Sequence, residues 1–186
     1  ALTAIKGVGR PVIDQVTVER EARGPFLSIQ DFVTRMADSE VNKRTVENFI
    51  KSGTFDGLGG TRKQFMSVFV QMMDAQQHNK KNNLAGQMSL FDLVDEEDKG
   101  EFEIRLPDVG EYSKELLLGF EKEVLGIYVS GHPLEEYEQT WRKHITRTTA
   151  DFLLDEETGE MNVRDQERVT IGGMISDKKI KYTRND

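Results

Sequence analysis

Apolar residues recur at intervals of three and four along most of the chain, a pattern that predicts helices. The predicted helices cover residues 10–21, 28–36, 43–52, 61–77, 113–125 and 133–143, and residues 1–5 fit the last turn of an earlier helix. From Val169 the apolar period changes to two, which predicts one β-strand and the beginning of a second. The sequence therefore predicts a mainly α chain with a short β segment near its C-terminal end.

Several helix starts are marked by side chains that can cap free amides, namely Ser28, Asn42 and Thr61. The helix over 113–125 is expected to turn four apolar residues inward, namely Leu116, Leu117, Phe120 and Val124. Residues 78–86 are polar and are expected to be loose, and residues 92–110 are acidic, with a proline and a glycine, as is typical of a linker.

Charge is distributed unevenly along the chain, whose net charge is −8. Residues 1–73 hold ten Lys/Arg and eight Asp/Glu, whereas residues 92–140 hold four and fifteen. The asymmetry favours a DNA-facing first part, although a solvated acidic linker explains residues 92–111 equally well. The absence of cysteine excludes disulfides and cysteine-ligated metals. No apolar run is long enough for a membrane span, so we expect a cytoplasmic fragment, cut from a longer chain, with no membrane partner.

Two bends have the composition of the hairpin in a helix-hairpin-helix module, and the first consists of Lys6, Gly7, Val8, Gly9 and Arg10. Its glycines allow a tight turn and let a phosphate approach without a Cβ in the way. Amides of the turn and of the next helix's first turn lack intrahelical partners and can bind an anion. The two flanking cations add charge, and Val8 is expected to plug the turn into the core. An ordinary helix end with a connector is the alternative interpretation.

The second bend is longer and looser, and its candidate contacts are Gly57, Gly59, Gly60, Thr61, Arg62 and Lys63. Two bends in one short stretch favour a paired DNA-binding module over two unrelated turns. Because such a module binds phosphates, its binding should be independent of base sequence and sensitive to salt.

An apolar pair stands out in the polar segment that follows, within the run Gln87, Met88, Ser89, Leu90 and Phe91. Exposed apolar pairs in polar segments are typical of docking peptides. Folding back onto the helical domain is an equally good interpretation. No pattern predicts catalytic or metal-binding residues: the three histidines lack metal-ligand spacing, and Glu121 and Glu123 point in different directions on a helix.

Several segments, in chain order, resemble the C family of bacterial replicative polymerases, the DNA polymerase III alpha subunits. They include residues 4–9, 51–62, 87–91, 121–126, 130–134 and 169–173, and two further stretches between the first and second of these, 24–26 with 31–32 and 41–44, belong to the same series. The Gly-His-Pro-Leu run at 131–134 is especially specific.

The resemblance implies a C-terminal-half fragment of such a subunit, divided into four parts. These would be a tandem helix-hairpin-helix domain over 1–77, a flexible linker with a clamp-binding motif over 78–110, a helical connector over 111–150, and the beginning of an incomplete OB-fold over 168–186. The family's catalytic aspartates lie upstream, so the fragment would hold no catalytic residue and no cofactor, while the parent polymerase is expected to use Mg²⁺.

The implied function is non-catalytic: binding the backbone of duplex DNA and docking the sliding clamp, the beta subunit, for processive replication beside other replisome subunits. A fragment of a helix-hairpin-helix repair enzyme, a glycosylase or a ligase, is the main alternative. A purely structural linker between polymerase domains is a third.

Overall fold

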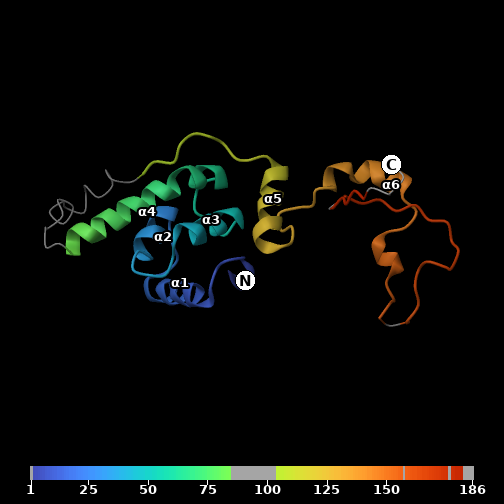
Figure 1. The fold of residues 1–186 in the computed structure, drawn as a ribbon, viewed down its shortest axis with the longest axis horizontal. Coiled ribbons are helices and arrows are strands. Elements are labelled where there is room, and N and C mark those ends of the chain that lie inside the picture. The colour runs from blue at the N-terminus through green and yellow to red at the C-terminus, as the bar shows by residue number, and fades with distance from the viewer. Residues whose placement is uncertain (1, 85–103, 157, 176, 182–186) are drawn as a thin grey trace. The chain divides into compact units, whose positions relative to one another are not determined.

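The computed structural model describes residues 2–84, 104–156, 158–175 and 177–181 (Figure 1). Contacts along the chain group into two compact units, Ala1–Ser130 and Gly131–Asp186. Each unit is described below by itself. The fold is mainly helical, as the sequence predicts.

Within its described residues, the N-terminal unit has a short 3₁₀ helix followed by five α-helices. In chain order these are the 3₁₀ helix Leu2–Ala4, α1 Arg10–Arg23, α2 Ile29–Arg35, α3 Lys43–Lys51, α4 Arg62–Leu84 and α5 Lys114–Leu125. Helix α4 packs against both α2 and α3, and α5 packs against α3. Figure 1 shows α2 and α3 lying beside the first half of α4.

Side-chain caps start the helices at the predicted places. The Ser28 hydroxyl accepts a hydrogen bond from the Asp31 amide at 3.0 Å, and the Asn42 side chain accepts one from the Thr45 amide at 3.0 Å. Thr61 and Gln64 cap each other reciprocally, since each side chain accepts from the other's amide. These caps satisfy amides that have no partner inside their own helix.

A cluster of phenylalanines forms the centre of the core, namely Phe32, Phe49, Phe55 and Phe65, all of them buried. Neighbouring rings meet edge to face, with centroids 5.0 to 6.5 Å apart. This geometry is the favoured one for aromatic pairs. Because Phe55 comes from the second bend and Phe49 from α3, the cluster fixes that bend against the helices.

The structure differs from the prediction in two of these helices. Helix α4 continues to Leu84, past the predicted end at residue 77, because neither glycine nor proline interrupts residues 62–84. Helix α5 buries Leu118, Glu121 and Val124, whereas Leu116 is exposed. The buried face of α5 is therefore rotated from the predicted one, so that it includes the carboxylate of Glu121 and excludes Leu116.

The C-terminal unit is small and open. Its helices are the 3₁₀ helix Glu135–Tyr137, α6 Glu138–His144 and the 3₁₀ helix Thr149–Phe152. Among its described residues none is buried, and no strand forms; an isolated bridge joins Leu154 to Met161. The strand predicted from Val169 is thus not formed in the described part. Within this segment the Thr170 carbonyl accepts from the Thr146 amide, and the Thr170 amide donates to the Thr146 hydroxyl. No β-ladder continues from this pair in the described residues.

No helix in the part of the chain that the structure describes is both long and apolar enough to cross a bilayer.

Candidate nucleic-acid interface

The first bend joins the 3₁₀ helix Leu2–Ala4 to α1. Gly7 has φ +75°, a backbone conformation that side chains with a Cβ rarely adopt. Gly9 is the N-cap residue of α1 in an extended conformation, and Pro11 lies in the first turn, where its missing N–H costs nothing. The predicted turn and helix start are therefore in place.

Two neighbouring helices hold this bend at Lys6. The Lys6 amide donates to the carbonyl of Val124 at 2.8 Å. The Lys6 carbonyl accepts from the side-chain nitrogen of Asn48, also at 2.8 Å. Asn48 belongs to α3 and is buried. Both backbone hydrogen-bonding groups of Lys6 are thus used by the fold, and the bend is fixed before any ligand arrives.

Of the bend's amides beyond Lys6, that of Val8 donates to the Ile5 carbonyl at 3.2 Å, whereas the others are unused within the described residues. Within the described residues, no hydrogen bond is donated by the amides of Gly7, Gly9, Arg10 or Val12. The first turn of α1 also contains no acidic residue, and Gly9 offers no side-chain cap. The side chains of Lys6 and Arg10 are exposed and have no partner in that part of the chain. Free amides at a helix N-terminus, flanked by cations, suit an oxyanion such as phosphate.

Gly9 supports this interpretation because the fold itself does not require a glycine there. Its φ of −75° is accessible to any residue. A Cβ at Gly9 would meet only the Cδ of Pro11, at an ordinary 3.6 Å. The missing side chain leaves the outer side of the bend open, where a ligand can approach the backbone closely.

The second bend, by contrast, is covered at Gly60. A Cβ at Gly60 would lie 2.6 Å from a ring carbon of Phe65 and 2.7 Å from Leu106 Cδ1, so internal packing explains this glycine. Leu106 belongs to residues 104–112, which we call the strap. The strap is tied to the bend by further hydrogen bonds, from Gln64 to the Pro107 carbonyl at 2.8 Å and from Thr61 to the Gly110 carbonyl at 2.6 Å.

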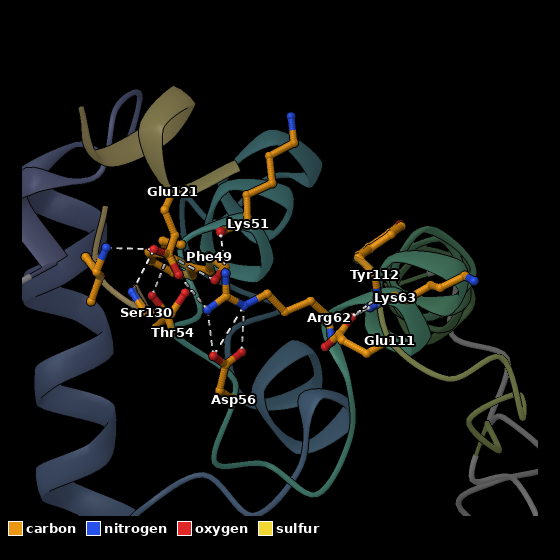
Figure 2. Close-up of polar contacts among 12 residues, drawn as sticks. Phe49, Lys51, Thr54, Asp56, Arg62, Lys63, Glu111, Tyr112, Glu121 and Ser130 are labelled. Atoms are coloured by element: carbon orange, nitrogen blue, oxygen red, sulfur yellow. Dashed lines mark hydrogen bonds and ion pairs between the residues drawn. The ribbon is translucent and has the colours of Figure 1, made fainter. Parts of the chain in front are cut away.

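The amides at the start of α4 are occupied by a carboxylate of the strap. Glu111 accepts from the Arg62 amide at 2.8 Å and from the Lys63 amide at 3.0 Å, one through each carboxylate oxygen (Figure 2). The sequence placed Thr61, Arg62 and Lys63 at a phosphate contact. In the structure the Thr61 amide donates to Gln64, and the Arg62 and Lys63 amides already bind a protein oxyanion at the position that a phosphate would take.

The guanidinium of Arg62 is also used inside the fold. It is buried and binds both oxygens of Asp56, at 2.9 and 2.7 Å, together with the Lys51 carbonyl at 3.2 Å and Glu121 at 3.1 Å. Figure 2 shows these groups converging on it. Arg62 was predicted to contact DNA; instead it joins the second bend to α3 and α5. The side chain of Lys63 has no partner among the described residues and stays available.

Glu121 completes this cluster and was missed by the sequence analysis. Its side chain is 0% exposed. One oxygen accepts from Arg62, and the other accepts from the amides of Val129 and Ser130 at 2.7 and 2.9 Å. Burial raises the pKa of the Glu121 carboxyl, but these hydrogen bonds together lower it by more, so its pKa lies below the ordinary value. The available signal was a glutamate at helical spacing between Leu118 and Val124.

Glu111 gives a first testable prediction. We expect Glu111→Ala to lower the free energy of unfolding by about 1 kcal/mol, the usual cost of losing a helix cap. It should also speed tryptic cleavage after Arg105, which lies in the strap. Asp108→Ala is the matched control, since Asp108 is exposed in the same strap and has no partner in the described residues. Equal effects of the two substitutions would show that the carboxylate does not hold the strap.

The clamp-motif residues 87–91 lie outside the described residues. Within the described residues, the candidate site is the first bend, formed by Lys6, Gly7, Val8, Gly9 and Arg10. Val8 is partly buried against the core, as expected for a plug. Gly57 and Gly59 lie in the second bend, and a Cβ at either would meet no neighbouring atom.

Comparison with known proteins agrees with this geometry. Residues 1–65 match the family model described as a helix-hairpin-helix motif. This part of the chain therefore contains a helix-hairpin-helix motif.

The relatives identify the family more closely. DNA polymerase III subunit alpha of Borreliella burgdorferi is 40% identical over 138 residues, which are 74% of this chain and 12% of that protein. The same subunit of Chlamydia pneumoniae is 37% identical over 148 residues, 79% of the chain and 12% of the relative. That of Mycobacterium leprae is 30% identical over 184 residues, 99% of the chain and 15% of the relative. The chain belongs to the DNA polymerase III alpha-subunit family, and it spans only 12% to 15% of the length of these relatives.

Proposed function

We propose that this chain is a segment of a replicative DNA polymerase that binds the backbone of duplex DNA through its first bend, without reading base sequence. One observation carries the proposal. Within the described residues, the amides of Gly7, Gly9 and Arg10 have no partner and stand beside two exposed cations, and neighbouring helices fix the bend in place. Phosphate contacts of this kind position a protein on DNA but do not distinguish bases.

The proposal assigns the second bend a different task. Its helix start is occupied by Glu111, and Gly60 is covered by Leu106. In the proposed function, this bend anchors the strap, and Lys63 contributes only long-range charge. In this proposal the two bends therefore differ in role: the first contacts the DNA backbone, and the second does not.

A salt series tests this function directly. Fluorescence anisotropy with two labelled duplexes of unrelated sequence should give equal affinities that fall steeply as salt increases, because neutralised phosphates release counterions. Affinity that differs strongly between the duplexes, or no binding at low salt, would overturn the proposal.

Clamp docking is a separate part of the proposal and rests on sequence alone. Gln87, Met88, Ser89, Leu90 and Phe91 would form the peptide that docks on the sliding clamp, the beta subunit. We expect replacement of Leu90 and Phe91 by alanine to abolish clamp binding in surface plasmon resonance and to leave duplex affinity unchanged. Persistent clamp affinity in that double variant would exclude this peptide as the docking site.

The remaining parts of the proposal follow the resemblance. The polymerising chemistry and Mg²⁺ would belong to other parts of the whole subunit, with no catalytic residue or cofactor in this segment. The divisions 1–77, 78–110, 111–150 and 168–186 are proposed domain limits, the last being the beginning of an OB-fold. A cytoplasmic location and contacts with other replisome subunits are proposed on the same basis.

A further inference from the structure

Helix α3 lies next to the first bend at Lys6 and Gly7. The approach is fixed by the buried Asn48, whose side-chain nitrogen donates to the Lys6 carbonyl at 2.8 Å. One turn earlier on α3 stands Arg44. A Cβ built on Gly7 would lie 3.4 Å from the Asn48 side-chain nitrogen and 3.9 Å from Arg44 Nε. Arg44 Nε therefore lies beside the space that a Gly7 side chain would take, although 37 positions separate the two residues in the sequence.

Arg44 differs from the other cations of α3 in having no partner. Lys43 binds Asp74 at 2.6 Å, and Lys51 binds Glu47 and Glu123 at 3.1 and 2.9 Å. Arg44 is exposed, and within the described residues it makes no hydrogen bond, ion pair or ring contact. The charge of its chain neighbour Lys43 is neutralised by Asp74 of α4, whereas the charge of Arg44 is not neutralised by any described residue.

We infer that Arg44 is a third cation of the first bend and binds the same DNA strand as the bend's amides, through a phosphodiester oxygen. The inference rests on the proposed duplex binding and adds a residue from a different helix. A guanidinium suits this task because its fixed fork of donors matches the oxygens of a phosphate. The φ of +75° is what requires a glycine at position 7, since a Cβ there would meet Asn48 and Arg44 only at ordinary contact distances.

The test compares Arg44→Ala with Lys43→Ala in the 186-residue chain. We expect Arg44→Ala to weaken binding to both unrelated duplexes several-fold and to lower the salt slope of log K by about 0.9, the value for one lost phosphate contact. Lys43→Ala should leave affinity within about twofold, because exposed ion pairs contribute little and its charge is already neutralised by Asp74. Arg44→Lys should keep most of the salt slope, since the positive charge remains.

Thermal unfolding of each variant, followed by circular dichroism, shows whether weaker DNA binding comes from a lost DNA contact or from a destabilised fold. Because Arg44 has no partner in the described residues, its alanine variant should unfold at the wild-type temperature. Wild-type binding with an unchanged salt slope in Arg44→Ala would overturn the inference about Arg44 alone. Failure of the wild-type chain to bind duplex would instead overturn the proposed function, and this inference with it.

Discussion

Reversing both cations of the first bend, Lys6→Glu together with Arg10→Glu, should weaken duplex binding by at least about tenfold at low salt and by a similar factor for every base sequence. Two attractive contacts are lost, and two negative charges are placed beside the unpartnered amides. Both side chains are exposed and make no hydrogen bond or ion pair within the described residues, so the fold should tolerate the change. Anisotropy titrations over a salt series measure the loss.

Two control variants locate the effect. Arg20→Glu reverses an exposed cation near the other end of α1, and Lys63→Glu reverses the available cation of the second bend. Each should reduce affinity far less than the double variant, because neither lies at the open amides. If Lys63→Glu were as damaging as the change at the first bend, the assignment of DNA contact to that bend would be wrong.

Replacing Glu121 with alanine should lower the free energy of unfolding by about 3 to 5 kcal/mol, the usual cost of removing one partner of a buried charge pair. Its loss leaves the Arg62 guanidinium buried without one of its two carboxylates and leaves the amides of Val129 and Ser130 without acceptors. Chemical denaturation with urea measures the change.

Glu123→Ala is the matched control for this variant. Glu123 lies two residues further along α5, is largely exposed, and binds Lys51 at 2.9 Å. Exposed ion pairs contribute about 0 to 1 kcal/mol, so this change should be mild. Similar costs at the two positions would show that the buried carboxylate has no special role.

The lowered pKa of Glu121 also sets the sign of a pH dependence. A carboxyl whose pKa is depressed by folding stabilises the folded state above its unfolded pKa, and this contribution is lost as pH falls through the lower folded pKa. The wild-type chain should therefore lose stability in the acid range, below the ordinary glutamate pKa. The Glu121→Ala variant should show a weaker acid dependence in the same denaturation series.

Local signals in the sequence predicted much of the fold. The caps at Ser28 and Asn42, the bend at Gly7 and Gly9, and the proline in the first turn of α1 each act within a few residues, so residue type and spacing suffice to find them. The first bend was predicted with its correct helix start and its two exposed cations.

The second bend could not be predicted because its occupant is distant in the sequence. Glu111 lies 49 positions beyond Arg62, in a stretch whose composition is typical of a linker. Nothing in the local pattern connects that carboxylate to the start of α4. The same holds for Glu121, which binds Arg62 although 59 positions separate the two residues. This contact places Glu121 on the buried face of α5. Arg44 was likewise overlooked, since only packing brings α3 to the bend.

An amide-resolved NMR titration of the chain with a short duplex tests the central claim most directly. The amides of Gly9, Arg10 and Val12 should shift on binding, whereas those of Arg62 and Lys63, bound by Glu111, should stay in place. Shifts confined to Arg62 and Lys63, with the first bend unmoved, would contradict the account.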